Sequence, residues 1–278
     1  MAGPVRTSPI AGTWYPGDPA AVAAEVEEYL EAARLPSPPG RLVGLISPHA
    51  GLRYSGPVAA HGYALLRGRP TLTAVLVGPS HRVAFAGAAV ATRGAFETPL
   101  GQVPIDEEMA DRLVAQGARI VDDARPHRSE HSLEMQLPFL QHVVPALRIV
   151  PVLMGSSERE DADMLAEALA VALEGTDALL IASSDLSHYH PAPQANALDA
   201  RVVEEIRRFD PGRLMERLET FPGHACGGGP MVAVMKAARR RGADRATILK
   251  YGDSGDVAEG DKALVVGYLA AALTATRE

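Results

Sequence analysis

The chain has 278 residues, of which 47% are hydrophobic and 22% are charged, a composition typical of a globular protein with a substantial core. Its 27 basic and 34 acidic residues give a net charge of −7, which argues against nucleic acid as a partner because such proteins usually carry a basic excess. The single cysteine excludes an intrachain disulfide and is typical of a reducing compartment.

No targeting or membrane-spanning segment is predicted. The N-terminal segment MAGPVRTSPIAGTWYPGDP has no continuous apolar run, so we expect no signal peptide. The longest apolar stretch, ALVVGYLAAALTA, is shorter than the roughly 20 residues that a membrane helix needs. We therefore expect a cytoplasmic protein without a membrane partner.

Short β-rich runs alternate along the chain with segments of helical periodicity. Strands are predicted at 42–46, 73–77, 87–91, 148–153, 178–182, 246–250 and 263–267. Helices are predicted at 19–33, 56–67, 106–116, 130–143, 159–174, 194–208 and 229–241. Apolar strands that alternate with helices indicate a mostly parallel sheet covered on both faces. The connection between the second and third predicted strands is too short for a helix, so part of the sheet is expected to be antiparallel.

The fold class that follows is α/β, with one α/β/α sandwich around a mostly parallel or mixed central sheet. The sequence has no long linker, internal repeat or low-complexity tract. We therefore expect a single domain over residues 1–278.

Two of the predicted strands end in small-residue loops that carry a histidine. The segment ISPHAG places His49 after the first strand, and VLVGPSH places His81 after the second. Ligands of open α/β sheets collect beyond the carboxyl ends of the strands, so the two loops are expected to converge. Each histidine alone could be a core or capping residue, but their matched positions favour metal ligands. Imidazole suits zinc, copper, iron and nickel, so the pair does not select a metal.

The only cysteine, Cys226, lies in the glycine-rich segment GHACGGGPM. It could be a small buried apolar residue, as free cysteine often is. Against that, glycines and Pro230 surround it and a helix is predicted directly after it, where backbone N–H groups favour a thiolate. The triple glycine lacks the Lys-Ser/Thr of a phosphate-binding loop. We predict Cys226 as the third metal ligand.

The segment SSDLSHYH follows the fifth predicted strand and offers an acid and two histidines. His188 is predicted to act as an acid–base group, because the unperturbed pKa of histidine is near neutrality. Asp185 could orient His188, hold a proton nearby or cap a turn. His190, directly before Pro191, is the weaker alternative.

The segment SEHSLEMQLPFLQHV is predicted to be an amphipathic helix with Ser129 as its cap. His131 and Glu134 are three residues apart and would share one face of that helix. They could bind a metal or support its ligands from behind, although an ordinary polar helix face explains the spacing equally well. The predicted buried stripe consists of Leu133, Leu137 and Leu140.

Two further polar or aromatic segments have open interpretations. GTWYPGDP places Trp14 beside a Pro-Gly turn, where it could line a pocket or anchor a folded-back N-terminal segment. YGDSGD, at 251–256, could supply polar substrate contacts or form a simple turn.

Taken together, these segments resemble the MEMO family, whose bacterial and archaeal members are called AmmeMemoRadiSam system protein B. The ordered matches extend over nearly the whole chain and are highly specific. They are WYPGDP at 14–19, PHAG at 48–51, YSG at 54–56, GPSH at 78–81, TPLG at 98–101, EHSLEMQLPFL at 130–140, SSDLSHY at 183–189, ACGGGP at 225–230, SGD at 254–256 and VGY at 266–268.

The resemblance implies a fold like that of the class III extradiol dioxygenases, non-haem iron enzymes that cleave catechol rings. It implies metal binding by the two loop histidines and the cysteine, here His49, His81 and Cys226. It also implies that His188 lines the same pocket, where its counterpart in the dioxygenases acts as an acid–base group.

Three departures, one from the dioxygenases and two from the family pattern, limit what the resemblance implies for this chain. Those enzymes use two histidines and a carboxylate, whereas this sequence offers a thiolate, which is softer and itself oxidisable. Leu52 stands where an aromatic residue is expected, and Arg82 where many relatives have another histidine. Arg82 could pair with an anionic substrate or partner, or have a surface role. The expected cofactor is a divalent transition metal, with iron or copper favoured and zinc possible.

Three functions are compatible with this sequence. The first is an iron- or copper-dependent redox enzyme, related to the dioxygenases, that acts on a small aromatic substrate. The second is a non-catalytic protein- or peptide-binding module that retains the pocket, since the resemblance links eukaryotic relatives to signalling and bacterial relatives to AMMECR1-like and radical-SAM proteins. The third is a hydrolase, which needs only the metal ligands and a base such as His188. A serine hydrolase is disfavoured because no G-x-S-x-G motif is present.

Overall fold

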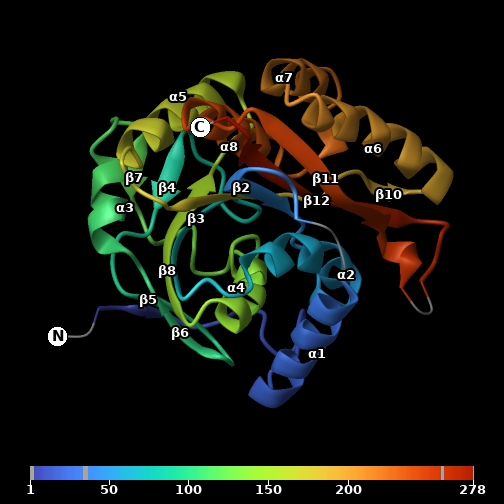
Figure 1. Cartoon of the computed structure of the whole chain (residues 1–278), viewed down its shortest axis with the longest axis horizontal. Helices are drawn as coiled ribbons and strands as arrows, with labels where there is room; N and C mark the ends of the chain where they lie inside the picture. The colour runs from blue at the N-terminus through green and yellow to red at the C-terminus, as the bar shows by residue number, and fades with distance from the viewer. Residues whose placement is uncertain (1–2, 34–36, 258–259, 278) are drawn as a thin grey trace.

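The computed structural model describes residues 3–33, 37–257 and 260–277. A mixed β-sheet forms the middle layer of the molecule, and helices pack on both of its faces (Figure 1). The α/β/α arrangement predicted from the sequence is confirmed. The buried apolar residues form one main cluster that extends from Ile10 to Ala275.

The strands form one large sheet and one small sheet. The large sheet has nine strands in the order β10-β12-β2-β9-β3-β8-β4-β7, with β11 also paired to β12, and the small sheet has the order β1-β5-β6. The strand bounds are β1 (Val5–Arg6), β2 (Arg41–Ser47), β3 (Thr71–Pro79), β4 (Ala88–Val90), β5 (Ala95–Thr98), β6 (Gly101–Pro104), β7 (Ile120–Asp122), β8 (Ala146–Met154), β9 (Leu179–Ser183), β10 (His188–His190), β11 (Arg245–Asp253) and β12 (Val265–Ala275).

The centre of the large sheet is parallel and its flanks are antiparallel. β2, β9, β3 and β8 run in the same direction, whereas β12 is antiparallel to β2. The antiparallel component predicted around the third strand is present, but β4 pairs with β8 and not with β3. All seven predicted strands are present; the last continues to Ala275, well beyond the predicted end at residue 267.

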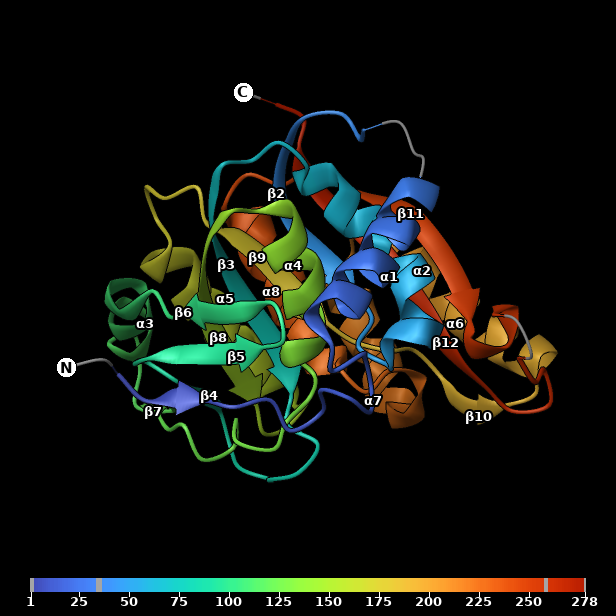
Figure 2. The same ribbon diagram turned by 90° about the horizontal axis from the view of Figure 1, so that it is seen from below.

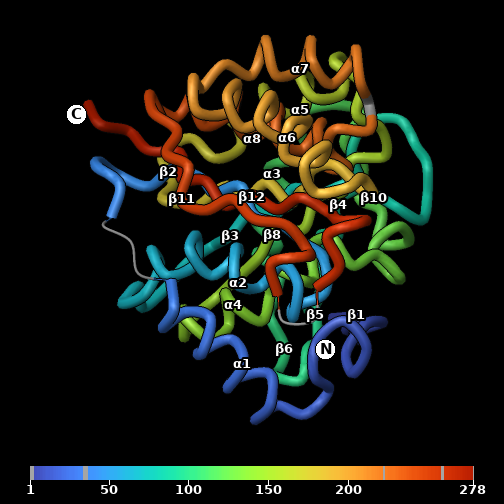
Figure 3. The backbone as a smooth tube through the Cα atoms, turned by 90° about the vertical axis from the view of Figure 1, so that its right-hand side faces the viewer, coloured from blue at the N-terminus to red at the C-terminus, as the bar shows by residue number. Residues whose placement is uncertain are grey.

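Helices cover both faces of the sheet. α5 and α8 pack on one face with α6 and α7 beside them, and α1, α2 and α4 cover the other (Figures 1 and 3). Figure 2 looks onto the second of these faces. The helix bounds are α1 (Pro19–Ala32), α2 (Leu52–Tyr63), α3 (Glu107–Val114), α4 (Leu137–Val143), α5 (Arg159–Ala172), α6 (Ala192–Arg207), α7 (Pro211–Thr220) and α8 (Gly228–Arg240). Over the described ranges, no helix is long and apolar enough to span a membrane.

The predicted helix at 130–143 is wrong in its first half. The chain forms turns up to residue 133, a 3₁₀ turn over Glu134–Gln136, and only then the helix α4 (Leu137–Val143). Pro138 lies in the first turn of α4, where its missing N–H costs no hydrogen bond. The predicted apolar stripe is nevertheless buried: Leu133, Leu137 and Leu140.

Helix α7 (Pro211–Thr220) has no counterpart among the predicted helices. The side chain of Asp210 accepts a hydrogen bond from the N–H of Arg213, and Pro211 occupies the first turn. These are the usual signals of a helix start. These signals are present in the sequence, but no helix was predicted here because the segment is short and mostly polar.

The parallel strands end together at one edge of the sheet. Ser47 at the end of β2 lies opposite Ser183 at the end of β9, and the last residues of β3 run beside β9. β2 is buried from Val43 onward because helices cover both of its faces. The loops after these strands therefore meet at the carboxyl edge of the sheet, where ligands of such folds bind.

Candidate metal centre

Three predicted ligands lie together at the carboxyl edge of the sheet. His49 follows β2, His81 follows β3, and Cys226 directly precedes α8. Their metal-binding atoms all lie within 4.8 Å of one another. The two imidazole rings are 5.2 Å apart between centroids, and Cys226 Sγ is 3.1 Å from His49 Nε2. The structure therefore brings these three residues into one cluster from three distant parts of the chain.

The neighbours of His49 determine which of its nitrogens carries the proton. His49 Nδ1 lies 2.9 Å from Ser183 Oγ, and the only hydroxyl proton of Ser183 is donated to the carbonyl of Ser132 at 2.6 Å. Ser183 Oγ must therefore accept a hydrogen bond from a protonated His49 Nδ1. This leaves His49 Nε2 unprotonated and facing the sulfur of Cys226, as metal ligation requires.

Gln136 fixes the hydroxyl of Ser183 in turn. Its Nε2 donates to Ser183 Oγ at 2.8 Å and to the carbonyl of Pro48 at 3.0 Å. Its Oε1 accepts from the hydroxyl of Tyr63 at 2.5 Å. Gln136 is fully buried, and the sequence analysis did not assign it to the site. Its only signal was a polar residue inside the otherwise apolar segment MQLPFL.

Glu130 keeps the proton of His81 on Nδ1, as Ser183 does for His49. It accepts from the backbone N–H of His81 at 2.5 Å, from His81 Nδ1 at 2.9 Å, and from the N–H groups of His131 and Ser132 at 2.8 and 2.9 Å. Although burial opposes its ionisation, these donors lower the pKa of Glu130 to about 2. An ionised Glu130 holds the proton of His81 on Nδ1 and leaves Nε2 free for a metal. Glu130 was not predicted to support the site, because the prediction assumed helical spacing over residues 130–133, which are not helical.

Burial also controls the protonation of the ligands themselves. Burial, with a smaller contribution from His81, lowers the pKa of His49 to about 3, so its imidazole is neutral at physiological pH. Burial, followed by the charge of Asp185, raises the pKa of the Cys226 thiol. A cation at the cluster would reverse that effect and stabilise the thiolate.

Gly227 allows the cysteine loop to approach β9 closely. A Cβ on Gly227 would come within 2.3 Å of the carbonyl oxygen of Ser183. The N–H of Gly227 donates to Ser184 Oγ at 3.0 Å, and that of Cys226 to the carbonyl of Asp185 at 3.3 Å. The glycine-rich sequence therefore brings Cys226 against the end of β9 and places its sulfur beside His49.

His188 lies in the same pocket with one nitrogen free. Its Nδ1 donates to the carbonyl of Leu186 at 2.8 Å, which leaves Nε2 unprotonated and able to act as a base. The carboxylate of Asp185 accepts from the backbone N–H of His49 at 2.7 Å, and among the described residues no hydrogen bond joins it to the imidazole of His188. Burial raises the pKa of Asp185 to about 6. Asp185 also lines the pocket, whereas His190 does not.

The pocket over the three ligands has a volume of about 680 Å³. Trp14, Arg82 and His131 line it. The ring of Trp14 lies 4.3 Å from that of His131, between centroids. Burial lowers the pKa of His131 to about 3. Leu52, one of the departures from the family pattern, is buried in the core, and its N–H donates to the carbonyl of Trp14 at 2.8 Å.

Glu134 does not belong to the pocket, which corrects its predicted role. Its carboxylate accepts from Arg6 Nη1 at 2.5 Å, from the hydroxyl of Tyr15 at 2.6 Å, and from Ser8. Glu134 is fully buried and fixes the N-terminal segment on the domain. Because residues 130–133 are not helical, His131 and Glu134 do not share a face.

The segment YGDSGD forms the end of β11 and a 3₁₀ turn over Ser254–Asp256, and it does not line the pocket. Asp253 and Asp256 cap this turn reciprocally. The ammonium group of Lys262 lies 2.7 Å from Asp253 Oδ1 and 2.5 Å from Asp256 Oδ1. The simple-turn interpretation explains these residues.

A second group of donors lies beside the first. Atoms of His81, Glu130 and His131 also fall within 4.8 Å of one another. The carboxylate of Glu130 is already occupied by four N–H donors, so it has little capacity left for a cation. The cluster of His49, His81 and Cys226 is therefore the better candidate for a metal site.

A possible metal cluster at the carboxyl edge of a mixed α/β sheet is the arrangement that the MEMO resemblance implies. The model of the family described as Memo-like protein matches residues 6–272. The chain belongs to the MEMO family, and its fold is of the class III extradiol dioxygenase type, as the sequence predicted.

Relatives match over almost the whole chain. A MEMO1 family protein of Methanopyrus kandleri is 40% identical over 277 residues, covering 95% of this chain and 97% of the relative. A MEMO1 family protein of Methanothermobacter thermautotrophicus is 39% identical over 274 residues, covering 95% and 98%. The crystal structure of an uncharacterized protein from Escherichia coli K12 aligns with a TM-score of 0.57 at 18% identity, covering 84% of this chain and 100% of that one. This last similarity concerns the fold alone.

Proposed function

We propose that this chain is a metal-dependent oxidoreductase that binds a divalent transition metal, iron or copper, through His49 Nε2, His81 Nε2 and Cys226 Sγ. The observation that carries the proposal is that these atoms lie within 4.8 Å of one another, while both histidines have Nδ1 engaged by fixed partners. Two imidazoles and one thiolate suit copper, iron and zinc. When bound, such an ion would supply redox chemistry and would polarise a substrate.

The substrate would lie in the pocket between the ligands and His188. His188 Nε2 is free to accept a proton from a substrate hydroxyl, because Nδ1 is held by the carbonyl of Leu186. Trp14 and His131 form an aromatic wall suited to a small planar molecule. Arg82 at the same pocket can pair with an anionic group of that molecule.

The proposal is tested by metal analysis and oxygen uptake. Protein purified without added metal should contain iron or copper in wild type and little in Cys226→Ser. After anaerobic reconstitution with Fe(II), wild type should consume oxygen with a member of a panel of catechols and other small aromatics, and His188→Gln should bind metal normally but turn over slowly. Oxygen uptake that is the same with and without bound metal for every compound of the panel would refute the proposed oxidoreductase activity. Retained zinc with esterase or amidase activity would support the metal-dependent hydrolase.

A second proposed function is a protein- or peptide-binding module that retains the pocket. Two aromatic side chains at the pocket favour it, since Tyr189 is 71% exposed and Tyr54 is 45% exposed, and exposed aromatic residues often mark binding surfaces. Peptides and the AMMECR1-like and radical-SAM proteins are the proposed partners. Capture of such a partner should survive Cys226→Ala and His49→Ala. Loss of capture on metal removal would favour a metal-centred role.

We also propose a cytoplasmic location, because a reducing compartment keeps a single cysteine available as a thiolate ligand. Fractionation of the native host should recover the protein, with its thiol reduced, in the cytoplasmic fraction. Recovery in another compartment would contradict this.

A further inference from the structure

Asp199 of α6 is a buried carboxylate outside the pocket that contacts the loop carrying His188. The residue is fully buried. Its Oδ1 accepts from the backbone N–H of Ser187 at 2.9 Å, and its Oδ2 lies 2.8 Å from the hydroxyl of Tyr251 on β11. Asp199 therefore connects α6 and β11 to the segment between β9 and β10.

A glycine in β12, Gly267, leaves room for this carboxylate. A Cβ on Gly267 would come within 1.9 Å of Asp199 Oδ2, so a larger residue at 267 is incompatible with Asp199 in this position. The same glycine holds the loop from the other side, because its N–H donates to the carbonyl of Ser187 at 2.9 Å and its carbonyl accepts from the N–H of Leu186 at 2.8 Å.

These contacts determine where the imidazole of His188 lies. The carbonyl of Leu186 accepts the proton of His188 Nδ1 at 2.8 Å, and the neighbouring Ser187 is held by Asp199. Tyr189, which follows His188, has a φ of +60°, a backbone region that a residue with a side chain adopts only where its surroundings enforce it. The turn is therefore held by its neighbours more than by its own backbone preference.

The burial of the Asp199 carboxylate beside the turn over residues 186–189 is energetically unfavourable. Among the described residues, no lysine or arginine forms an ion pair with Asp199, whose two hydrogen-bond partners are the neutral groups of Ser187 and Tyr251. Burial without a cation is unfavourable to the charged form, and it raises the pKa of Asp199. A neutral side chain could fasten a turn at lower cost.

We propose that Asp199 is a positioning residue that holds the turn over residues 186–189 against β12 and so fixes the imidazole of His188 with Nδ1 protonated and Nε2 free. Asp199 does not line the pocket, so it acts through His188 and touches no substrate. Its relevance to catalysis rests on the acid–base role proposed for His188, whereas its effect on the imidazole is independent of that role.

The test is ¹⁵N NMR of the histidine rings in the full-length chain, both metal-free and loaded with Zn(II). Wild type is compared with Asp199→Ala, Asp199→Asn and Tyr251→Phe. Asp161→Ala is the control, because Asp161 is similarly buried and also accepts from a backbone N–H, that of Gly87 at 3.0 Å, and from a hydroxyl, that of Ser156 at 2.5 Å, although unlike Asp199 it also pairs with Arg119. Thermal melting of each variant establishes that it is folded, and Zn(II) affinity is measured on the same samples.

In wild type and in Asp161→Ala, His188 is expected to show a single tautomer with the proton on Nδ1. Asp199→Ala should lose this preference and show a mixture of tautomers. Asp199→Asn should restore the tautomer in part, because an amide oxygen can still accept from Ser187, and Tyr251→Phe should have a smaller effect. Zn(II) affinity should stay within about threefold of wild type throughout, because the metal ligands are held by other residues.

An unchanged His188 spectrum in a folded Asp199→Ala protein overturns the proposal. If that variant does not fold, an unchanged spectrum in both Asp199→Asn and Tyr251→Phe overturns it as well. Failure of wild type to bind any metal would count against the proposed function but would leave this test intact, since the tautomer is read in the metal-free protein too.

Discussion

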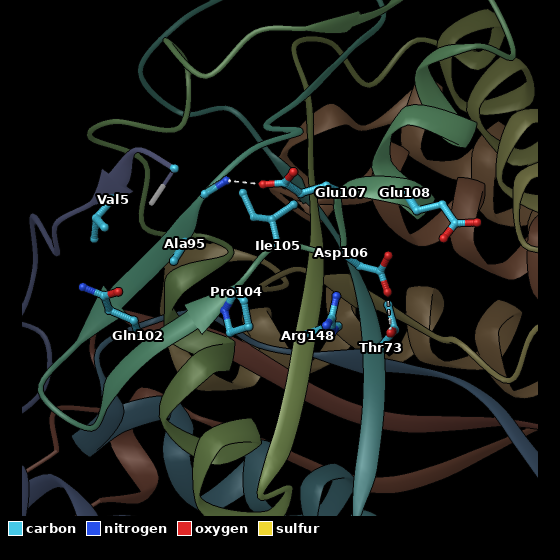
Figure 4. A pocket seen from close by; sticks show the side chains of 12 residues that line it. Val5, Thr73, Ala95, Gln102, Pro104, Ile105, Asp106, Glu107, Glu108 and Arg148 are labelled. Atoms are coloured by element: carbon cyan, nitrogen blue, oxygen red, sulfur yellow. Dashed lines mark hydrogen bonds between the residues drawn. The ribbon is translucent and has the colours of Figure 1, made fainter. Parts of the chain in front are cut away.

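The two ends of the central sheet each carry a pocket, of about 680 Å³ at the carboxyl ends of the strands and about 700 Å³ at the amino ends. The second pocket, shown in Figure 4, lies beside the first residues of β3 and β8. Its lining includes Asp106, Glu107 and Glu108 together with Arg148. In volume and in charged side chains, the two pockets are comparable.

They differ in how their polar groups are held. In the amino-end pocket, Asp106 accepts from Thr73 at 2.9 Å and Glu107 from the N–H of Gly94 at 3.1 Å, which are contacts that fasten neighbouring segments. In the carboxyl-end pocket, three histidines have Nδ1 bound by a fixed partner. The Nε2 atom of His49 faces Cys226 Sγ, and those of His81 and His188 have no hydrogen-bond partner among the described residues. Side-chain nitrogens that are held in place by their neighbours and face a cavity indicate chemistry, whereas the volume of a cavity alone does not.

The largest expected effect is the removal of one ligand at the carboxyl end. His49→Ala should weaken Fe(II) or Zn(II) binding by more than the roughly 10–100-fold that loss of a supporting residue costs. Asp106→Ala at the other end should leave the affinity unchanged. Competition titration against a chelator measures both. Equal losses of metal affinity in the two variants would show that the metal does not bind specifically at the carboxyl-end pocket.

The supporting carboxylate provides the next test. Glu130→Gln keeps the shape of the side chain but removes the charge that holds the proton on His81 Nδ1, so metal affinity should fall by about 10–100-fold. Glu107→Gln, a carboxylate of the amino-end pocket, is the control. Affinity equal to that of wild type in Glu130→Gln would show that the tautomer of His81 is fixed by something else.

The metal affinity should rise with pH. The pKa of the Cys226 thiol is raised by burial, so the free site is protonated on sulfur and must release that proton to bind. His49, whose pKa is lowered to about 3, contributes no proton between pH 6 and 8. The apparent association constant should therefore increase about tenfold per pH unit in this range. A flat profile, measured by the same competition titration, would mean that sulfur is not a ligand.

His127, a buried histidine that lines neither of these two pockets, tests the effect of burial at a position outside the candidate site. His127 is as buried as His49, at 2% exposure each, and burial lowers the pKa of His127 to about 4. Since the folded protein holds it neutral while the unfolded chain takes up a proton below about pH 6.5, stability is lost as pH falls from 6.5 toward 4, by up to about 3 kcal/mol.

His127→Phe should therefore show a weaker loss of stability over that range, with metal affinity unchanged. Urea unfolding at pH 7 and pH 4.5 measures the difference between variant and wild type. A parallel decline of the two proteins would contradict the pKa assigned to His127.

Much of the site was predictable because it follows a rule of topology. Strands that are apolar throughout indicate parallel pairing, and parallel strands end at one edge, which places His49 and His81 together without knowledge of the intervening chain. Cys226 stood out as the only cysteine, in a glycine-rich loop next to a helix start. The family motifs supported the same residues independently.

The supporting residues were not predictable in this way. Ser183, Gln136 and Glu130 act through contacts that exist only after the chain has folded, so the spacing of residues along the sequence does not assign them these roles. Glu134 was chosen over Glu130 because helical spacing was assumed, whereas the N–H groups after Glu130 turn back onto its own carboxylate. Local competition of this kind overrides periodicity.

X-ray absorption spectroscopy of the protein loaded with one equivalent of Zn(II) tests whether His49, His81 and Cys226 together hold one metal ion. We expect one sulfur scatterer at about 2.3 Å and at least two nitrogen scatterers at about 2.0–2.1 Å, with the sulfur lost in Cys226→Ser. A first shell without sulfur in wild type, or one that is identical in the variant, would contradict it.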